Sequence, residues 1–171
     1  MVEELVGVIP HVLKATGRIE SKHNTVVVTS QRLIIAQFTG IQMQEALAQS
    51  KARAKGFIEK LTAGRVLTPK DVVEYSRKYF EMDPDHIAAE TPGNISVPVE
   101  AIRRIYIDHQ VDPEDGDSRI QTDRYILTIL ADTGESEYVF DADPQDIDVL
   151  RKAMGEKVHG DGRAKPIRPP F

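Results

Sequence analysis

The stretch from Asn24 to Phe38, NTVVVTSQRLIIAQF, decides the predicted fold. Two runs rich in β-branched residues, Thr25 to Thr29 and Leu33 to Ala36, flank the polar pair Ser30-Gln31. Branched side chains are stiff at χ1 and pack well on a pleated surface, so both runs are predicted strands. A polar pair between two such runs predicts a β-hairpin.

Five further segments have the character of strands. The first, Leu5 to Ile19, contains Pro10 and Gly17, so we expect a long strand that bends. The other four follow the middle of the chain: Ile95 to Val99, Ile102 to His109, Ile120 to Leu130 and Ser136 to Phe140. In the last one, apolar and acidic residues alternate, which predicts one solvent-facing side.

Helical spacing replaces strand alternation between the third and fourth predicted strands. Ile41 to Leu61 is predicted to be one helix that ends near Gly64, with an apolar stripe formed by Met43, Leu47, Ala54, Phe57 and Leu61. Thr68-Pro69 begins a second helix, and its buried face is predicted to comprise Val72, Tyr75, Ser76 and Tyr79. Asp83-Pro84 begins a short third helix that ends at Ala89.

The C-terminal part of the chain divides into a helix and a tail. Asp143-Pro144 is a clear helix start, and Ile147, Leu150 and Met154 lie along one side of the helix that follows. We therefore predict one domain over residues 1–155, interrupted by a helical insertion at residues 41–91. Residues 156–171 are rich in Gly, Pro and basic residues and are predicted to form a flexible tail.

Composition limits the classes of function. The 171-residue chain carries a net charge of −5, which argues against a nucleic-acid partner. It contains no cysteine, so disulfides and thiolate chemistry are excluded. No apolar run approaches the roughly 20 residues that a membrane-spanning helix needs. We expect a cytoplasmic protein, either free or peripheral at a membrane.

The order of predicted elements resembles that of the pleckstrin-homology-like superfold, in particular its GRAM and bacterial PH-like branches. The resemblance rests on Val26 to Ile35, which looks like the strand-turn-strand phrase of those domains, and on Ile95 to Ile105, which looks like their small strand, short turn and next strand. Tyr138-Val139-Phe140 leading into the final helix fits as well. The resemblance covers about two-thirds of the chain and departs from the family at the helical insertion.

The resemblance implies an α+β fold and a non-catalytic role. It implies an antiparallel β-barrel or sandwich of about seven strands, capped by the C-terminal helix, with a helical insertion after the third strand. The segments before Gly40 and after Asn94 would then close into one curled sheet. It also implies a binding or scaffolding module without catalytic residues, recruited to membranes or built into assemblies.

The motifs of enzymes and metal proteins are missing from the sequence. The chain has neither a Gly-x-Ser-x-Gly elbow nor a glycine-rich phosphate loop. The acidic run from Asp112 to Asp117 lacks the Gly and Glu spacing of a calcium loop, so a solvated loop is the better interpretation. His86 lies near Asp83, Asp85 and Glu90, but no second histidine stands close to it. We predict no enzyme activity, no cofactor and no metal.

Two interaction surfaces remain as hypotheses. The first is a surface on the insertion for a protein partner or a second copy of the chain, made by Phe57, Leu61, Tyr75, Tyr79 and Phe80. The second is a site for anionic membrane lipid around the first strand and turn, made by Lys14, Arg18, Lys22 and His23. Thr25 to Thr29 contains no basic residue, which departs from the phosphoinositide-binding PH pattern and argues against inositol phosphate.

Overall fold

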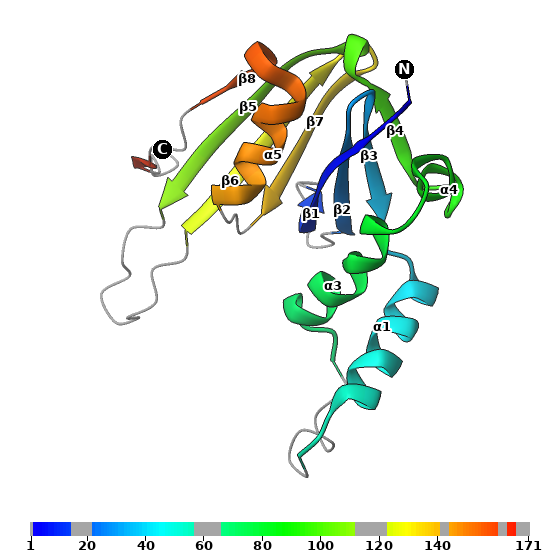
Figure 1. Cartoon of the computed structure of the whole chain (residues 1–171). Helices are drawn as coiled ribbons and strands as arrows, with labels where there is room; N and C mark the ends of the chain where they lie inside the picture. Colours follow the sequence, from blue (N-terminus) through cyan, green and yellow to red (C-terminus); the bar gives the residue numbers. More distant parts are fainter. Residues whose placement is uncertain are drawn as a thin grey trace.

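One mostly antiparallel sheet runs through the chain (Figure 1). The computed structural model describes residues 2–14, 22–56, 66–111, 123–140, 144–160 and 164–166. The strands are β1 (Leu5–Lys14), β2 (Lys22–Thr29), β3 (Arg32–Gln37), β4 (Ile95–Pro98), β5 (Ile102–Val111), β6 (Asp123–Ala131), β7 (Gly134–Phe140), β8 (Val158–His159) and β9 (Ala164–Pro166). Their order is β4-β3-β2-β1-β7-β6-β5-β8, and β9 also pairs with β5. All seven predicted strands are therefore present in one sheet, and the fold is α+β.

Four helices in the described part of the chain are joined to this sheet. They are α1 (Gly40–Arg53), α3 (Pro69–Ser76), α4 (Pro84–Ala89) and α5 (Pro144–Met154). Short 3₁₀ turns occupy Arg77–Phe80 (η1), Val99–Ala101 (η2) and Gly155–Lys157 (η3). We call residues 40–94, which lie between β3 and β4, the helical segment. Among the described residues, no helix combines the length and the apolar content that crossing a bilayer requires.

The β2–β3 hairpin turns without a glycine because Thr29 supplies the missing hydrogen bonds. Its hydroxyl accepts from the backbone N–H groups of Gln31 and Arg32 at 3.2 and 3.0 Å. The two strands then pair in register from Val28 opposite Leu33 to Asn24 opposite Gln37. The predicted hairpin at Ser30-Gln31 is confirmed.

The bend predicted in the first strand lies at Pro10. The pairing of β1 with β2 shifts between Ile9 and Val12, so Pro10 and His11 form a bulge. His11 takes a φ of +54°, a conformation that side chains rarely adopt. Residues 15–21, including Gly17, lie outside the described part of the chain.

The inner face of the sheet joins both halves of the chain to α5. Val12, Val26 and Leu33 from β1–β3 belong to the same buried cluster as Ile105, Leu127 and Phe140 from β5–β7. The side chains that α5 contributes to this cluster are Ile147, Leu150 and Met154. The segments before Gly40 and after Asn94 thus form one sheet with α5 packed on its shared core, as expected.

The opposite face of β1–β3 is covered by the helical segment. Val27 and Ile34 are fully buried against Tyr79 of η1 and Ile87 of α4. Thr25 of β2 forms a buried hydroxyl–hydroxyl hydrogen bond of 2.8 Å with Ser76 of α3. Because both faces of these strands are covered, consecutive residues of β2 are buried instead of alternate ones.

The predicted helix starts are confirmed where the structure describes them. Thr68 caps α3 in a capping box with Asp71, and Asp83 caps α4 through the backbone N–H of Asp85. Helix α1 also begins with a capping box, made by Thr39 and Gln42. Short polar side chains at these positions satisfy the N–H groups that the first helical turn leaves unpaired.

Two sequence-based expectations about element boundaries are wrong. The predicted single helix over Ile41 to Leu61 is interrupted, because α1 ends at Arg53 and Ala54 is already extended. Phe57 and Leu61 of the predicted stripe lie outside the described residues. Gly56 follows closely, and glycine is a poor helix residue. Part of the predicted flexible tail is ordered, because β8 and β9 add to the edge of β5 in parallel. An open strand edge has unpaired backbone groups that such short segments can satisfy even when their side chains are polar.

Candidate functional site

The first predicted site lies where β1 ends and β2 begins. Lys14 and Lys22 are directly opposite each other in the β1–β2 ladder. His23 precedes Asn24 on β2, and its ring lies 5.3 Å from that of His11. Lys14 and Lys22 therefore share one face of the ladder, whereas His23, which is opposite Leu13, lies on the other face with His11. Arg18 lies outside the described residues.

The electrostatics of this site favour an anion. Like charges directly opposite each other on neighbouring strands are destabilising, so an anion bound between Lys14 and Lys22 would relieve their repulsion. Burial lowers the pKa of His23. Its Nδ1 is buried and makes no hydrogen bond within the described residues. Burial thus disfavours the charged imidazole, so the positive charge here comes from the two lysines.

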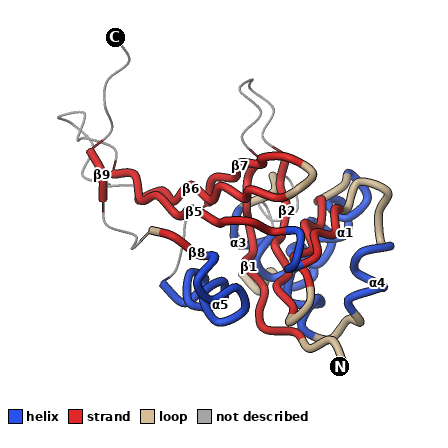
Figure 2. The backbone as a smooth tube through the Cα atoms, turned by 90° about the horizontal axis from the view of Figure 1, so that it is seen from above, coloured by secondary structure: helices blue, strands red, loops and turns tan. Residues whose placement is uncertain are grey.

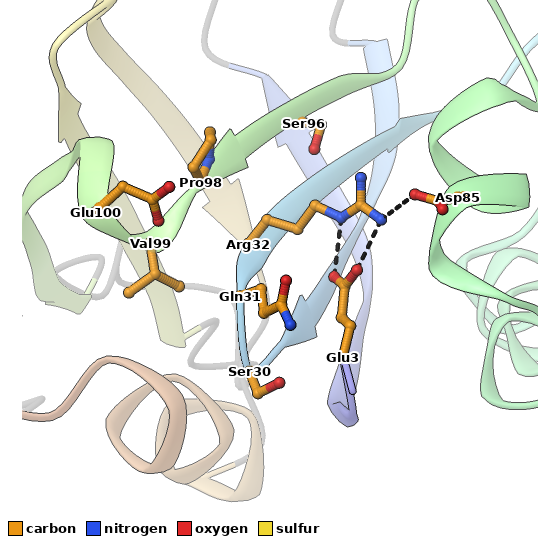
Figure 3. Close-up of a pocket in the computed structure, with 9 residues that line it drawn as sticks. All are labelled: Glu3, Ser30, Gln31, Arg32, Asp85, Ser96, Pro98, Val99 and Glu100. Carbon is orange, nitrogen blue, oxygen red and sulfur yellow. Dashed lines mark hydrogen bonds and ion pairs between the residues drawn. The ribbon is translucent and has the colours of Figure 1, made fainter. Parts of the chain in front are cut away.

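A second polar site is a cleft of about 770 Å³ beside the β2–β3 turn (Figure 3). At its centre, Arg32 donates from Nε and Nη2 to the two carboxylate oxygens of Glu3, each at 2.8 Å. Nη2 also bonds the carboxylate of Asp85 on α4. The remaining walls come from Ser30, Gln31, Ser96, Pro98, Val99 and Glu100.

This cleft joins three separate parts of the chain. The hydrogen bonds of Glu3 and Asp85 raise the pKa of Arg32 above its ordinary value. Because two carboxylates already neutralise the guanidinium, the cleft offers no net positive charge to an anion. The arrangement instead ties the N-terminal residues and α4 to the start of β3. Sequence reasoning missed it because Glu3 and Asp85 lie 29 and 53 positions from Arg32.

Within the described ranges, no group of three or more His, Asp or Glu side chains could hold a metal ion. The acids near His86 have other roles. Asp83 caps α4, Asp85 pairs with Arg32, and Glu90 bonds Lys78 and Tyr79. The acidic run from Asp112 to Asp117 lies outside the described residues.

Two of the aromatic residues predicted to meet a partner are instead buried in the chain's own interior. Tyr75 is 3% exposed and donates to Glu45 of α1 at 2.6 Å, and Tyr79 is 1% exposed and donates to Glu90 at 2.9 Å. The prediction that they line a partner surface is wrong, whereas their predicted place on the buried face of the second helix is confirmed.

A charged network holds these tyrosines in place. The ammonium group of Lys78 lies 4.1 Å from the ring centre of Tyr75 and donates to its hydroxyl at 2.8 Å. It also bonds Glu90. Burial, followed by the nearby carboxylates of Glu45 and Glu90, raises the pKa of Tyr75 above its ordinary value. Burial and Glu90 do the same for the pKa of Tyr79.

Phe80 differs from both tyrosines because its side chain is on the surface. It is 57% exposed at the end of η1. Phe57 and Leu61, the other two predicted members of the partner surface, lie outside the described residues. Of the predicted surface, the structure therefore leaves Phe80 available to a partner.

Comparisons with protein-family models, with curated proteins and with solved structures find no match for this chain.

Proposed function

We propose that the chain is a non-enzymatic, pleckstrin-homology-like interaction module whose helical segment binds another protein chain. Support for the PH-like assignment comes from the antiparallel path β4-β3-β2-β1-β7-β6-β5 and from the C-terminal helix α5 on the core shared by both halves. In this proposal the helical segment is an insertion that adds a binding surface to the module.

One observation carries the proposal: most exposed large apolar side chains belong to the helical segment. Among the described residues, those that are well exposed are Val2, Ile41, Val66, Val73, Phe80 and Ile95. Four of these six lie between residues 40 and 94, on or beside α1, α3 and η1. Apolar side chains gathered on one part of a surface are typical of protein-binding regions.

The helical segment is also fixed firmly enough to present such a surface. Tyr79 and Ile87 bury it against β1–β3, and the Lys78 network joins α1, η1 and α4. The Arg53–Glu74 ion pair at 3.2 Å connects the end of α1 to α3. A surface that is ordered before binding avoids much of the entropic cost of association.

Site-specific photo-crosslinking tests this function. A photoreactive phenylalanine analogue at position 80, in chains produced in the native cells, is expected to form a covalent adduct with a second copy or with another protein. The same analogue at Lys152, an exposed position on α5, serves as the control. Adducts from position 80 that also disappear with Val73→Glu support the proposal. No adduct from position 80, or equal adducts from position 152, contradicts it.

The alternative function is recruitment to anionic lipid through the first strand and turn. The observation that favours it is the direct juxtaposition of Lys14 and Lys22. Sedimentation with vesicles containing phosphatidylserine, at low and high salt, tests it. Binding should weaken as screening increases and should be lost in the Lys14→Glu, Lys22→Glu double variant. Lys152→Glu should leave it unchanged, and salt-independent binding would contradict this alternative.

A further inference from the structure

The outer face of β5, β6 and β7 is not covered by any helix of the described part of the chain. The residues of these strands that point toward α5 are buried, as in Ile105, Leu127 and Tyr138. The alternate residues point away from α5, and none of them is fully buried. Figure 2 shows α5 on one side of these strands, while α1, α3 and α4 gather by β1–β3.

The register of the strands orders this outer face into rows. The first row places Glu135, Leu130 and Arg104 side by side, from β7 across β6 to β5. The next row consists of Glu137, Thr128 and Tyr106, and a third of Val139, Ile126 and Asp108. A strip with Leu130 and Ile126 at its ends therefore runs along β6, between two strands that carry charge.

In the first row, the opposite charges of Glu135 and Arg104 are separated by the intervening strand β6. Glu135 and Arg104 are both exposed and lie on strands two places apart. Neighbouring strands are about 4.8 Å apart, so the two backbones are separated by roughly 10 Å. Arg104 instead donates to the hydroxyl of Tyr106 on its own strand at 3.1 Å. The row thus has an acidic end and a basic end that do not meet within one chain.

We propose that the outer face of β5–β7 binds a second copy of the chain, with the twofold axis along β6. Rotation by 180° about an axis in the interface, parallel to β6, exchanges the positions of β5 and β7. Arg104 of each copy then faces Glu135 of the other. Leu130 and Ile126, which lie on the axis, meet their own counterparts. The first row is therefore complementary to itself and the apolar strip is covered, while Glu137 faces Tyr106 and Asp108 faces Val139 of the other copy.

The size of the face sets the strength of this dimer. Three strands about 4.8 Å apart and about five residues long give a contact of roughly 15 by 17 Å. A standard stable interface buries about 800 Å² on each partner. The outer face is smaller than this, so the dimer is weak and reversible. It differs from the proposed binding by the helical segment in the surface that makes the contact.

Charge reversal with complementation tests the geometry. Sedimentation velocity of the full chain at about 10–500 µM should show a monomer–dimer equilibrium. Arg104→Glu places two acids opposite each other at both contacts, and Glu135→Arg places two bases there. Each single variant should dimerise about 10- to 100-fold more weakly, because like charges are costly in an interface. An equimolar mixture of the two variants, and the double variant R104E/E135R, should both dimerise again.

The controls separate this result from a folding defect and from the proposed function. Lys152→Glu on α5 should leave the dimer unchanged, and the thermal unfolding midpoint of each variant should stay within a few degrees of the parent. Phe80→Arg should also leave it unchanged, so the dimer and the binding by the helical segment succeed or fail independently. A parent chain that stays monomeric throughout the concentration range overturns the inference. So do single variants that dimerise as well as the parent, or a mixture that does not restore dimers.

Discussion

The two halves of the sheet are built from the same kind of strand but are covered differently. Strands β2 and β3 have α5 and the core on one face and the helical segment on the other, and Val26, Val27 and Val28 are all fully buried. Strands β6 and β7 are covered on one face, so buried and exposed residues alternate in β7. The difference shows that, on the face of β1–β3 that points away from α5, the helical segment takes the place of solvent.

The largest expected effect comes from truncating matched isoleucines on the two faces that point away from α5. Ile34→Ala removes a fully buried side chain between β3 and the helical segment and should lower the free energy of unfolding by about 3 kcal/mol. Ile126→Ala removes a partly buried one and should cost only about 1 kcal/mol. Urea denaturation measures both. Equal losses would mean that the two halves are covered alike.

A glycine substitution should reveal how closely α5 approaches the covered half. A Cβ at Gly7 would lie 2.7 Å from both methyl carbons of Val149 on α5. Gly7→Ala should therefore cost about 2 kcal/mol, and Val149→Ala in the same chain should recover part of the loss. Gly40→Ala at the start of α1, where a Cβ meets nothing within 4 Å, is the matched control and should be neutral. Equal thermal unfolding midpoints for Gly7→Ala and Gly40→Ala would contradict the close packing of Val149 on Gly7.

Removal of one hydroxyl group should have different effects on the two halves. Tyr79→Phe deletes a buried hydrogen bond to Glu90 and should lower the free energy of unfolding by about 1–2 kcal/mol. Tyr106→Phe deletes only a contact with an exposed arginine on the outer face of β5, and its effect should be close to zero. Chemical denaturation of both variants measures these losses. A larger loss of stability for Tyr106→Phe than for Tyr79→Phe would contradict the view that the hydroxyl at position 79 is the buried one.

The smallest expected effect is a pH-dependent one at the start of α3. Burial acts to raise the pKa of Asp71, but hydrogen bonds from Thr68 and Ser50 and the charge of Arg53 outweigh it, so the pKa is lowered. The ionised carboxylate therefore stabilises the fold above its ordinary pKa of about 3.9, and that contribution is lost as pH falls through the lower folded value.

Asp71→Asn should accordingly cost about 1 kcal/mol at pH 7 and less at a pH below the folded value. The comparison variant is Asp132→Asn, which breaks an exposed ion pair with Arg103 near the β6–β7 turn and should cost little at any pH. Urea denaturation over a pH series measures the free energy of unfolding of both variants. A cost at position 71 that does not diminish in acid would show that the carboxylate charge is not the cause.

Local patterns were enough to predict most of the fold. The β-branched runs around Ser30-Gln31 predicted the central hairpin, and Thr68 and Asp83 predicted the starts of α3 and α4. Alternation in β7 predicted that Tyr138 and Phe140 point inward. Each of these signals depends on residues only a few positions apart.

Features that depend on distant residues were missed or misread. Nothing near Arg32 indicates that Glu3 and Asp85 will hold it, and nothing near Val158 indicates that it will pair with Ile105. The sequence places Tyr75 and Tyr79 on a buried face and also among the residues of a partner surface, and it does not separate the two. Only tertiary packing distinguishes Tyr79, which is buried, from Phe80, which is exposed.

The most direct test of the central claim is thiol labelling, because the chain has no cysteine of its own. Ala36→Cys places a thiol beneath the helical segment, and Thr128→Cys places one on the outer face of β6. In dilute native protein, the thiol at position 128 should react readily with a small aromatic disulfide reagent, while that at position 36 should react at least about 100-fold more slowly. Equal rates at the two positions would contradict the account, because they would mean that the helical segment does not cover the sheet.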